Sequence, residues 1–215
     1  MPGTLTEELV VSDVGGAGGD TGSGGDGWSG SRGNSATPRR AYFTVMAMAL
    51  AGILMFFMAL TSAYIVRKGT GGDWRAIELP AVVWLNTAVL VVSSLTLERA
   101  RRRFAAGNVS SFRSWWLITT ALGVAFLVGQ YVAWRELIVT GVFLSTNPSS
   151  SFFYVFTAAH ALHLLGGVIA LGYVAARSNE HLLRRGGLPA DVAGVYWHFM
   201  DGLWVFLFLL LTLGR

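Results

Sequence analysis

The chain has 215 residues, of which 53% are hydrophobic and only 13% charged, and its mean hydropathy is +0.53. These values lie outside the range of soluble domains and indicate a polytopic membrane protein. Cysteine is absent, which excludes disulfides, thiolate metal sites and thiol catalysis. The net charge of +4 comes from basic residues in short segments between apolar runs, a pattern that membrane topology requires, so it does not indicate a nucleic-acid partner.

Residues 1–38 form a glycine-rich stretch with too little apolar surface to offset the entropy of ordering it, so we expect a disordered N-terminal tail. Residues 39–215 are expected to form one transmembrane domain with long apolar runs between short polar segments. The expected spans cover residues 41–66, 79–97, 112–134, 152–176 and 192–213. The predicted fold class is therefore all-α, a membrane bundle of five transmembrane helices.

The basic residues also predict how the bundle is oriented. If the N-terminus is cytoplasmic, 11 of the 16 lysines and arginines fall in cytoplasmic segments, including the cluster between Arg99 and Arg103. Cytoplasmic loops of membrane proteins carry an excess of these residues. We therefore expect the N-terminus in the cytoplasm and the C-terminus outside.

Isolated polar residues interrupt the second and third spans. Asn86, Ser93 and Ser94 are expected to form hydrogen bonds to neighbouring helices, and an amide bond across to another helix is the favoured role of Gln130. The loop after the third span contains Asn147, followed by a proline and serines, and this pattern predicts an N-cap for the fourth helix.

The last two spans contain ionisable residues, which are expensive in lipid. His160 and His163 lie in the fourth span, and His198 and Asp201 lie in the fifth. Each pair is spaced three residues apart, so its two members share one helix face that must turn toward protein. We expect the two polar faces to meet and, with Gln130, to form a structural polar network.

Other roles for these residues are weaker. The chain has four histidines, one of which, His181, belongs to a loop, and this number is too small for a histidine-rich di-iron enzyme. One or two axial histidines would suffice for a haem, so the count does not exclude it. A proton relay needs groups that reach both aqueous phases, and the first three spans have no carboxylate within them. No pattern indicates a catalytic residue.

Two motifs carry a family resemblance. FTAAHALHLLGG (156–167) and VYWHFMDGLWVFLF (195–208) resemble the paired motifs of subunit III of the haem-copper terminal oxidases. The segments FMALTSAYIVRK (57–68) and LGVAFLVGQ (122–130) are also similar, so the resemblance covers residue 41 to the end. Besides the polar pairs, the matching motif residues are Thr157, Gly166, Tyr196, Trp197, Phe199 and Trp204.

The resemblance implies a non-catalytic subunit of a caa3-like cytochrome c oxidase in the bacterial inner membrane. Such a subunit packs on catalytic subunit I, beside other oxidase subunits, and stabilises it. Haem and copper would lie in the partner subunits, none in this chain, and bound phospholipid is compatible with the family. The complex would take electrons from cytochrome c or quinol, reduce oxygen and translocate protons. The alternatives are a subunit-III-like accessory protein of a nitric oxide reductase and, from a different class, a stand-alone membrane transporter.

The sequence departs from the family pattern at buried acidic positions. Gly52 and Ile53 stand where many members have a serine-glutamate pair, and Ala133 replaces a further glutamate. The chain also has five expected spans, whereas many members have seven. The acidic group that is most often linked to proton handling in the family is therefore missing here.

Overall fold

The computed structural model describes residues 39–70, 72, 74, 80–145, 147–177 and 187–214. The expected tail (1–38) and His181 lie outside these residues. The described chain forms five helices, and no strand occurs in it. The helices are α1 (Arg39–Thr70), α2 (Ala81–Ala105), α3 (Val109–Val139), α4 (Pro148–Ala176) and α6 (Leu188–Leu213).

All five helices are long and apolar enough to cross a membrane, which confirms the predicted all-α membrane fold. Each helix extends past its expected span at one or both ends. α2 begins later than expected, at Ala81, because Pro80 is the residue before the helix and not part of its first turn.

Local sequence signals explain where the helices begin. α2 and α3 form an antiparallel hairpin whose turn places Gly107 at a φ of 75°, a backbone conformation that favours glycine. Asn108 then caps α3 by accepting a hydrogen bond from the Ser111 backbone N–H at 3.0 Å. The predicted cap of α4 is confirmed, because Asn147 and Ser150 form a reciprocal capping box there.

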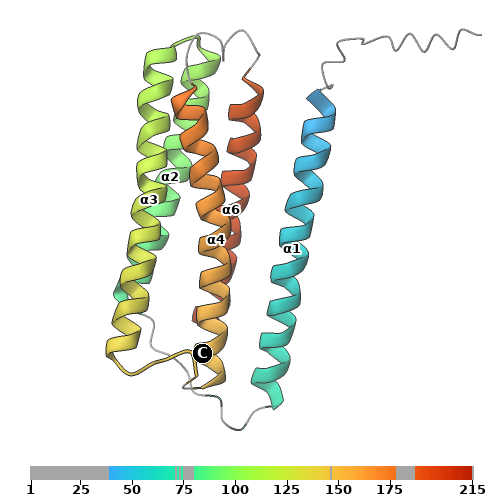
Figure 1. Ribbon diagram of the computed structural model, residues 1–215, viewed down its shortest axis with the longest axis vertical. Coiled ribbons are helices and arrows are strands. Elements are labelled where there is room, and N and C mark those ends of the chain that lie inside the picture. Colours follow the sequence, from blue (N-terminus) through green and yellow to red (C-terminus); the bar gives the residue numbers. More distant parts are fainter. Residues whose placement is uncertain are drawn as a thin grey trace, which may run out of the picture. The chain divides into compact units, whose positions relative to one another are not determined.

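α2, α3, α4 and α6 run side by side, and α1 lies at the edge against α4 and α6 (Figure 1). Each of the four bundle helices buries one stripe of residues spaced alternately three and four apart, the heptad pattern of helices that pack knobs into holes. The stripe residues are, in α2, Val83, Asn86, Leu90, Ser93, Leu97 and Ala100; in α3, Phe112, Trp116, Thr119, Gly123, Phe126, Gln130, Ala133 and Leu137; in α4, Phe153, Thr157, His160, Leu164, Gly167, Leu171 and Val174; and in α6, Ala190, Ala193, Trp197, Met200, Trp204 and Leu207.

α1 is attached more loosely. Only three of its residues are buried, and they lie in its second half: Phe57, Thr61 and Tyr64. The Tyr64 hydroxyl donates a 2.9 Å hydrogen bond to the carbonyl of Gly214, just after α6. At the other end of α1, Arg39 forms an ion pair with Asp191 in the first turn of α6.

Candidate functional site

Trp197 of α6 packs at the centre of the bundle. Its indole lies between two glycines, because a Cβ atom on Gly123 of α3 would meet Cη2 at 2.5 Å and one on Gly167 of α4 would meet Cε3 at 3.2 Å. Its Nε1 donates a 3.0 Å hydrogen bond to the Ser93 hydroxyl of α2. One side chain of α6 therefore contacts all three other bundle helices, and its polar atom is satisfied.

His160 is fully buried about two turns farther along the bundle. Its ring lies against Trp204 of α6, with ring centroids 5.1 Å apart, and against the edge of Phe126 of α3, at 5.9 Å. Neither ring nitrogen forms a hydrogen bond within the described residues. Trp204 donates its own N–H to Thr87 of α2 at 3.1 Å. His160 therefore packs as an aromatic residue, and hydrogen bonds do not connect it to the other predicted polar residues.

His163 points to a different neighbour from His160. Its ring contacts Phe57 of α1, with centroids 5.8 Å apart, and its Nδ1 donates to the carbonyl of Ala159 in its own helix at 2.7 Å. Its backbone carbonyl accepts a 2.8 Å hydrogen bond from the Tyr196 hydroxyl of α6. Since the two histidine rings diverge, they do not present a joint pair of ligands. Within the described residues, no group of three or more candidate ligands could hold a metal ion.

His198 and Asp201 face α2, whereas the sequence had led us to expect that they meet the polar face of the fourth span. The Nδ1 atom of His198 lies 2.7 Å from the Ser94 hydroxyl of α2, within hydrogen-bond distance. Asp201 also interacts with Ser94, but neither of its buried carboxylate oxygens has a well-formed hydrogen bond within the described residues. The reason is the rotation of α6 about its own axis. Because Trp197 fits closely against α3 and α4, the adjacent face of α6, which carries His198 and Asp201, turns toward α2.

The predicted five-residue network is therefore not continuous. The amide of Gln130 is buried and has no hydrogen-bond partner in the described part of the chain, and the same holds for Nδ2 of Asn86. The expectation for the two serines of α2 is confirmed, since Ser93 and Ser94 both bond to α6. Within the described residues, the two serines therefore form hydrogen bonds between helices, whereas Gln130 forms none.

Sequence reasoning missed several residues that position the site. Gly123 and Gly167 admit the indole of Trp197, and Thr87 accepts from Trp204. Trp116 of α3 donates a buried 2.9 Å hydrogen bond to the carbonyl of Leu171 in α4. The available signal was the alternating three- and four-residue spacing, which places each of these residues except Thr87 in the buried stripe of its own helix.

The comparison with known proteins covers the whole described bundle. The family model for "Cytochrome c oxidase subunit III" matches residues 40–213. The chain belongs to the cytochrome c oxidase subunit III family. This confirms the resemblance drawn from the two motifs.

Curated relatives agree with the family match. A "Probable cytochrome c oxidase subunit 3" of Nocardia farcinica is 34% identical over 168 residues, which are 74% of this chain and 81% of the relative. The protein of the same name from Mycobacterium leprae is 33% identical with the same coverage. A "Cytochrome c oxidase subunit 3" of Synechocystis is 29% identical over 189 residues, covering 85% of this chain and 79% of the relative.

The structure also places the remaining residues that the subunit III motifs single out. Thr157 is fully buried and accepts a 3.0 Å hydrogen bond from the N–H of Trp134. Phe199 packs partly buried against the core, and Gly166 is exposed, with Tyr196 as the only neighbour of an added Cβ. Ile53, at the position of the glutamate in the serine-glutamate pair, packs partly buried against the core, and Ala133, at the other acidic position, is fully buried.

Proposed function

We propose that this chain is the non-catalytic subunit III of a caa3-like haem-copper terminal oxidase in the bacterial inner membrane. In this role it packs on catalytic subunit I and stabilises it, while haem and copper are held by partner subunits. The observation that carries the proposal is the family match, which runs through all five helices from residue 40 to residue 213.

The geometry supports a scaffold role. Three buried tryptophans of α3 and α6 donate hydrogen bonds to other helices and so connect the bundle by specific contacts: Trp116, Trp197 and Trp204. In lipid, helices associate through such hydrogen bonds and close packing, because the hydrophobic effect does not drive them together there. The oxygen reduction and proton translocation of the complex would then be performed by its other subunits, with electrons from cytochrome c or quinol.

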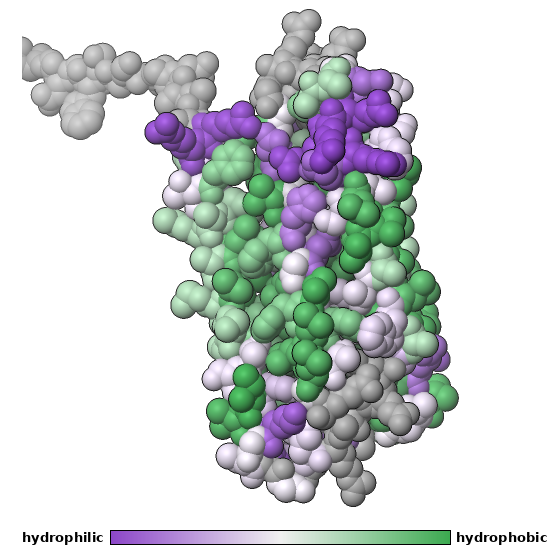
Figure 2. All heavy atoms as spheres, turned by 180° about the vertical axis from the view of Figure 1, so that it is seen from behind, coloured by the Kyte–Doolittle hydropathy of each residue, from purple (hydrophilic) through white to green (hydrophobic). Residues whose placement is uncertain are grey.

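The proposed orientation places the arginine-rich end of the bundle in the cytoplasm. The start of α1, the end of α2 and the start of α6 meet there, as the ion pairs of Asp191 with Arg39 and Arg101 show. The space-filling view shows hydrophilic residues gathered at this end above an apolar body (Figure 2). Bound phospholipid is part of the proposal, and a groove of about 600 Å³ between α1 and α6 offers apolar walls for an acyl chain.

A pull-down of the tagged chain in mild detergent tests this function, with an optical spectrum and mass spectrometry of the recovered material. We expect a haem-bearing, multi-span partner and oxygen consumption with cytochrome c or quinol. A tagged membrane protein of similar size, expressed in the same cells, controls for nonspecific recovery. A nitric oxide reductase as partner would contradict the oxidase assignment. A colourless, stable chain without partners would contradict the subunit role and favour a stand-alone transporter.

A further inference from the structure

A line of polar residues runs along the contact between α2 and α6. On α2, Ser94, Glu98 and Arg101 are spaced four and three residues apart, so they share one helix face. On α6, His198 and Asp201 are three residues apart and also share a face. The two faces meet at Ser94, whose hydroxyl lies 2.7 Å from the Nδ1 atom of His198. Asp201 interacts with the same hydroxyl, although this contact is not a well-formed hydrogen bond. Ser94 therefore stands between the two ionisable side chains of α6.

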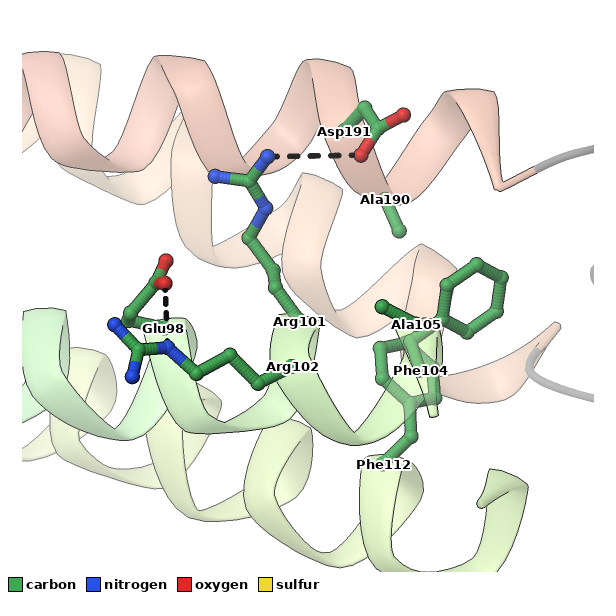
Figure 3. A pocket seen from close by; sticks show the side chains of 8 residues that line it. All are labelled: Glu98, Arg101, Arg102, Phe104, Ala105, Phe112, Ala190 and Asp191. Atoms are coloured by element: carbon green, nitrogen blue, oxygen red, sulfur yellow. Dashed lines mark hydrogen bonds and ion pairs between the residues drawn. The ribbon is translucent and has the colours of Figure 1, made fainter. Parts of the chain in front are cut away.

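One end of this polar line is open to water. The side chain of Glu98 is 42% exposed and pairs with Arg102, and Arg101 extends across to Asp191 at the start of α6 (Figure 3). These residues line a pocket of about 480 Å³ at the arginine-rich end of the bundle, which is large enough to hold water. Figure 2 shows hydrophilic residues continuing from this end down into the apolar face. Glu98 and Arg101 are also the charged groups that act on His198, so His198 is the next ionisable residue along the line.

The other end of the line is closed at Asp201. His198 is partly exposed, whereas Asp201 is 7% exposed and both of its carboxylate oxygens are fully buried. No ionisable residue occurs in residues 202–213 of α6 or in residues 81–93 of α2, which lie beyond Asp201 along the same contact. Within the described residues, no charged group acts on Asp201. Asp201 is therefore the innermost ionisable group of the line, and it has no direct contact with water.

Ser94 can pass a proton between His198 and Asp201, because a hydroxyl accepts one hydrogen bond while it donates another. When the contact of Asp201 shortens to a hydrogen bond, the ionised carboxylate accepts from the Ser94 O–H. The Ser94 oxygen then accepts from the Nδ1–H of His198, which leaves Nε2 of the same ring as an acceptor. Nε2 makes no hydrogen bond within the described residues, and it is not among the fully buried atoms that lack a partner. It is therefore accessible to a proton from the aqueous end.

A proton that binds to Nε2 of His198 can move on by two short transfers. As the new Nε2–H bond forms, the Nδ1 proton passes to the Ser94 oxygen and the Ser94 proton passes to the Asp201 carboxylate. The net change is one proton added to the carboxylate, while His198 stays neutral and Ser94 keeps one proton. A carboxylate that is buried without a cation costs free energy, so the neutral acid is the favoured form.

We infer that Asp201 is a proton-binding site that exchanges protons with the arginine-rich aqueous end through His198 and Ser94. The site fills and empties from the same end, because the line of ionisable groups stops at Asp201. It therefore holds a proton within the bundle and does not conduct protons across the membrane. The inference goes beyond the proposed scaffold role, and it depends only on residues of this chain.

Infrared spectroscopy of the full chain in lipid nanodiscs tests the inference by hydrogen–deuterium exchange. The C=O band of a protonated carboxyl is separate from the bands of carboxylates, and it shifts when deuterium replaces the proton. We expect this band in the unmodified chain at neutral pH, its loss in Asp201→Asn, and its shift after transfer into D2O. Ser94→Ala and His198→Phe should each slow the exchange about tenfold or more, because each removes a group that relays the proton.

Thr96→Val is the matched control, because the Thr96 hydroxyl lies 2.9 Å from that of Thr119 on α3 and so belongs to another face of α2. It should leave the carboxyl exchange unchanged. The direction of the effect separates a relay from a structural role: a loosened bundle would exchange faster, and the amide bands of the same spectra record any loosening.

Four results would overturn the inference. They are a carboxyl band that persists in Asp201→Asn, a band that does not exchange in the unmodified chain, exchange in Ser94→Ala as fast as in the unmodified chain, and equal slowing by Thr96→Val.

Discussion

Gly123→Ala tests whether the fit of Trp197 between two glycines determines the stability of the bundle. The new Cβ would lie 2.5 Å from Cη2 of Trp197, which is about 1 Å short of an ordinary van der Waals contact. The indole cannot retreat freely, because Gly167 lies on another side of it and its N–H is bonded to Ser93.

The expected magnitude follows from two opposing effects. Overpacking a close-packed core costs about 1–3 kcal/mol. Replacing glycine by alanine within a helix returns about 0.5–1 kcal/mol. We therefore expect Gly123→Ala to lower the free energy of unfolding by about 1–2 kcal/mol. Gly172→Ala is the matched control, because its Cβ meets nothing within 4 Å, and it should raise the free energy of unfolding by about 0.5–1 kcal/mol.

The assay is unfolding of the purified chain in mixed micelles with increasing dodecyl sulfate, followed by far-ultraviolet circular dichroism. A second variant separates the clash from a general effect of alanine at this position. Trp197→Phe removes the indole atoms that the new Cβ would meet, so Gly123→Ala should cost little in that background. If Gly123→Ala and Gly172→Ala shift stability in the same direction by the same amount, the reasoning about the Trp197 contact is refuted.

Three further predictions concern hydrogen bonds and charges, each measured in the same unfolding assay. Trp116→Phe removes the buried bond to the Leu171 carbonyl and should cost about 1–2 kcal/mol; an unchanged midpoint would count against that bond. Asp201→Asn should change stability by less than about 1 kcal/mol, because no well-formed hydrogen bond reaches the carboxylate in the described chain, and a loss several times larger would reveal a partner. Asp191→Asn breaks the ion pairs with Arg39 and Arg101 and should cost at most about 1 kcal/mol, an effect that high salt should reduce; salt independence would contradict it.

The amino-acid sequence by itself determined the fold class and the family. Long apolar runs must become helices in lipid, because every backbone polar group has to be satisfied within the segment, and this follows from composition alone. The cap at Asn147 was also predictable, since it depends on neighbours within one turn. The two motifs in the last spans were sufficient to indicate the subunit III family, which the comparisons confirm.

Only the tertiary structure decided which helix each polar residue faces. The spacing of His198 and Asp201 places them on one face of α6, but it cannot say whether that face meets α4 or α2. The rotation of α6 about its axis is determined by the fit of Trp197 between Gly123 of α3 and Gly167 of α4. Both glycines lie far from Trp197 in the sequence. The spacing of residues within one helix shows only which residues share a face of that helix. The neighbouring helix that each face contacts depends on how all four helices pack together.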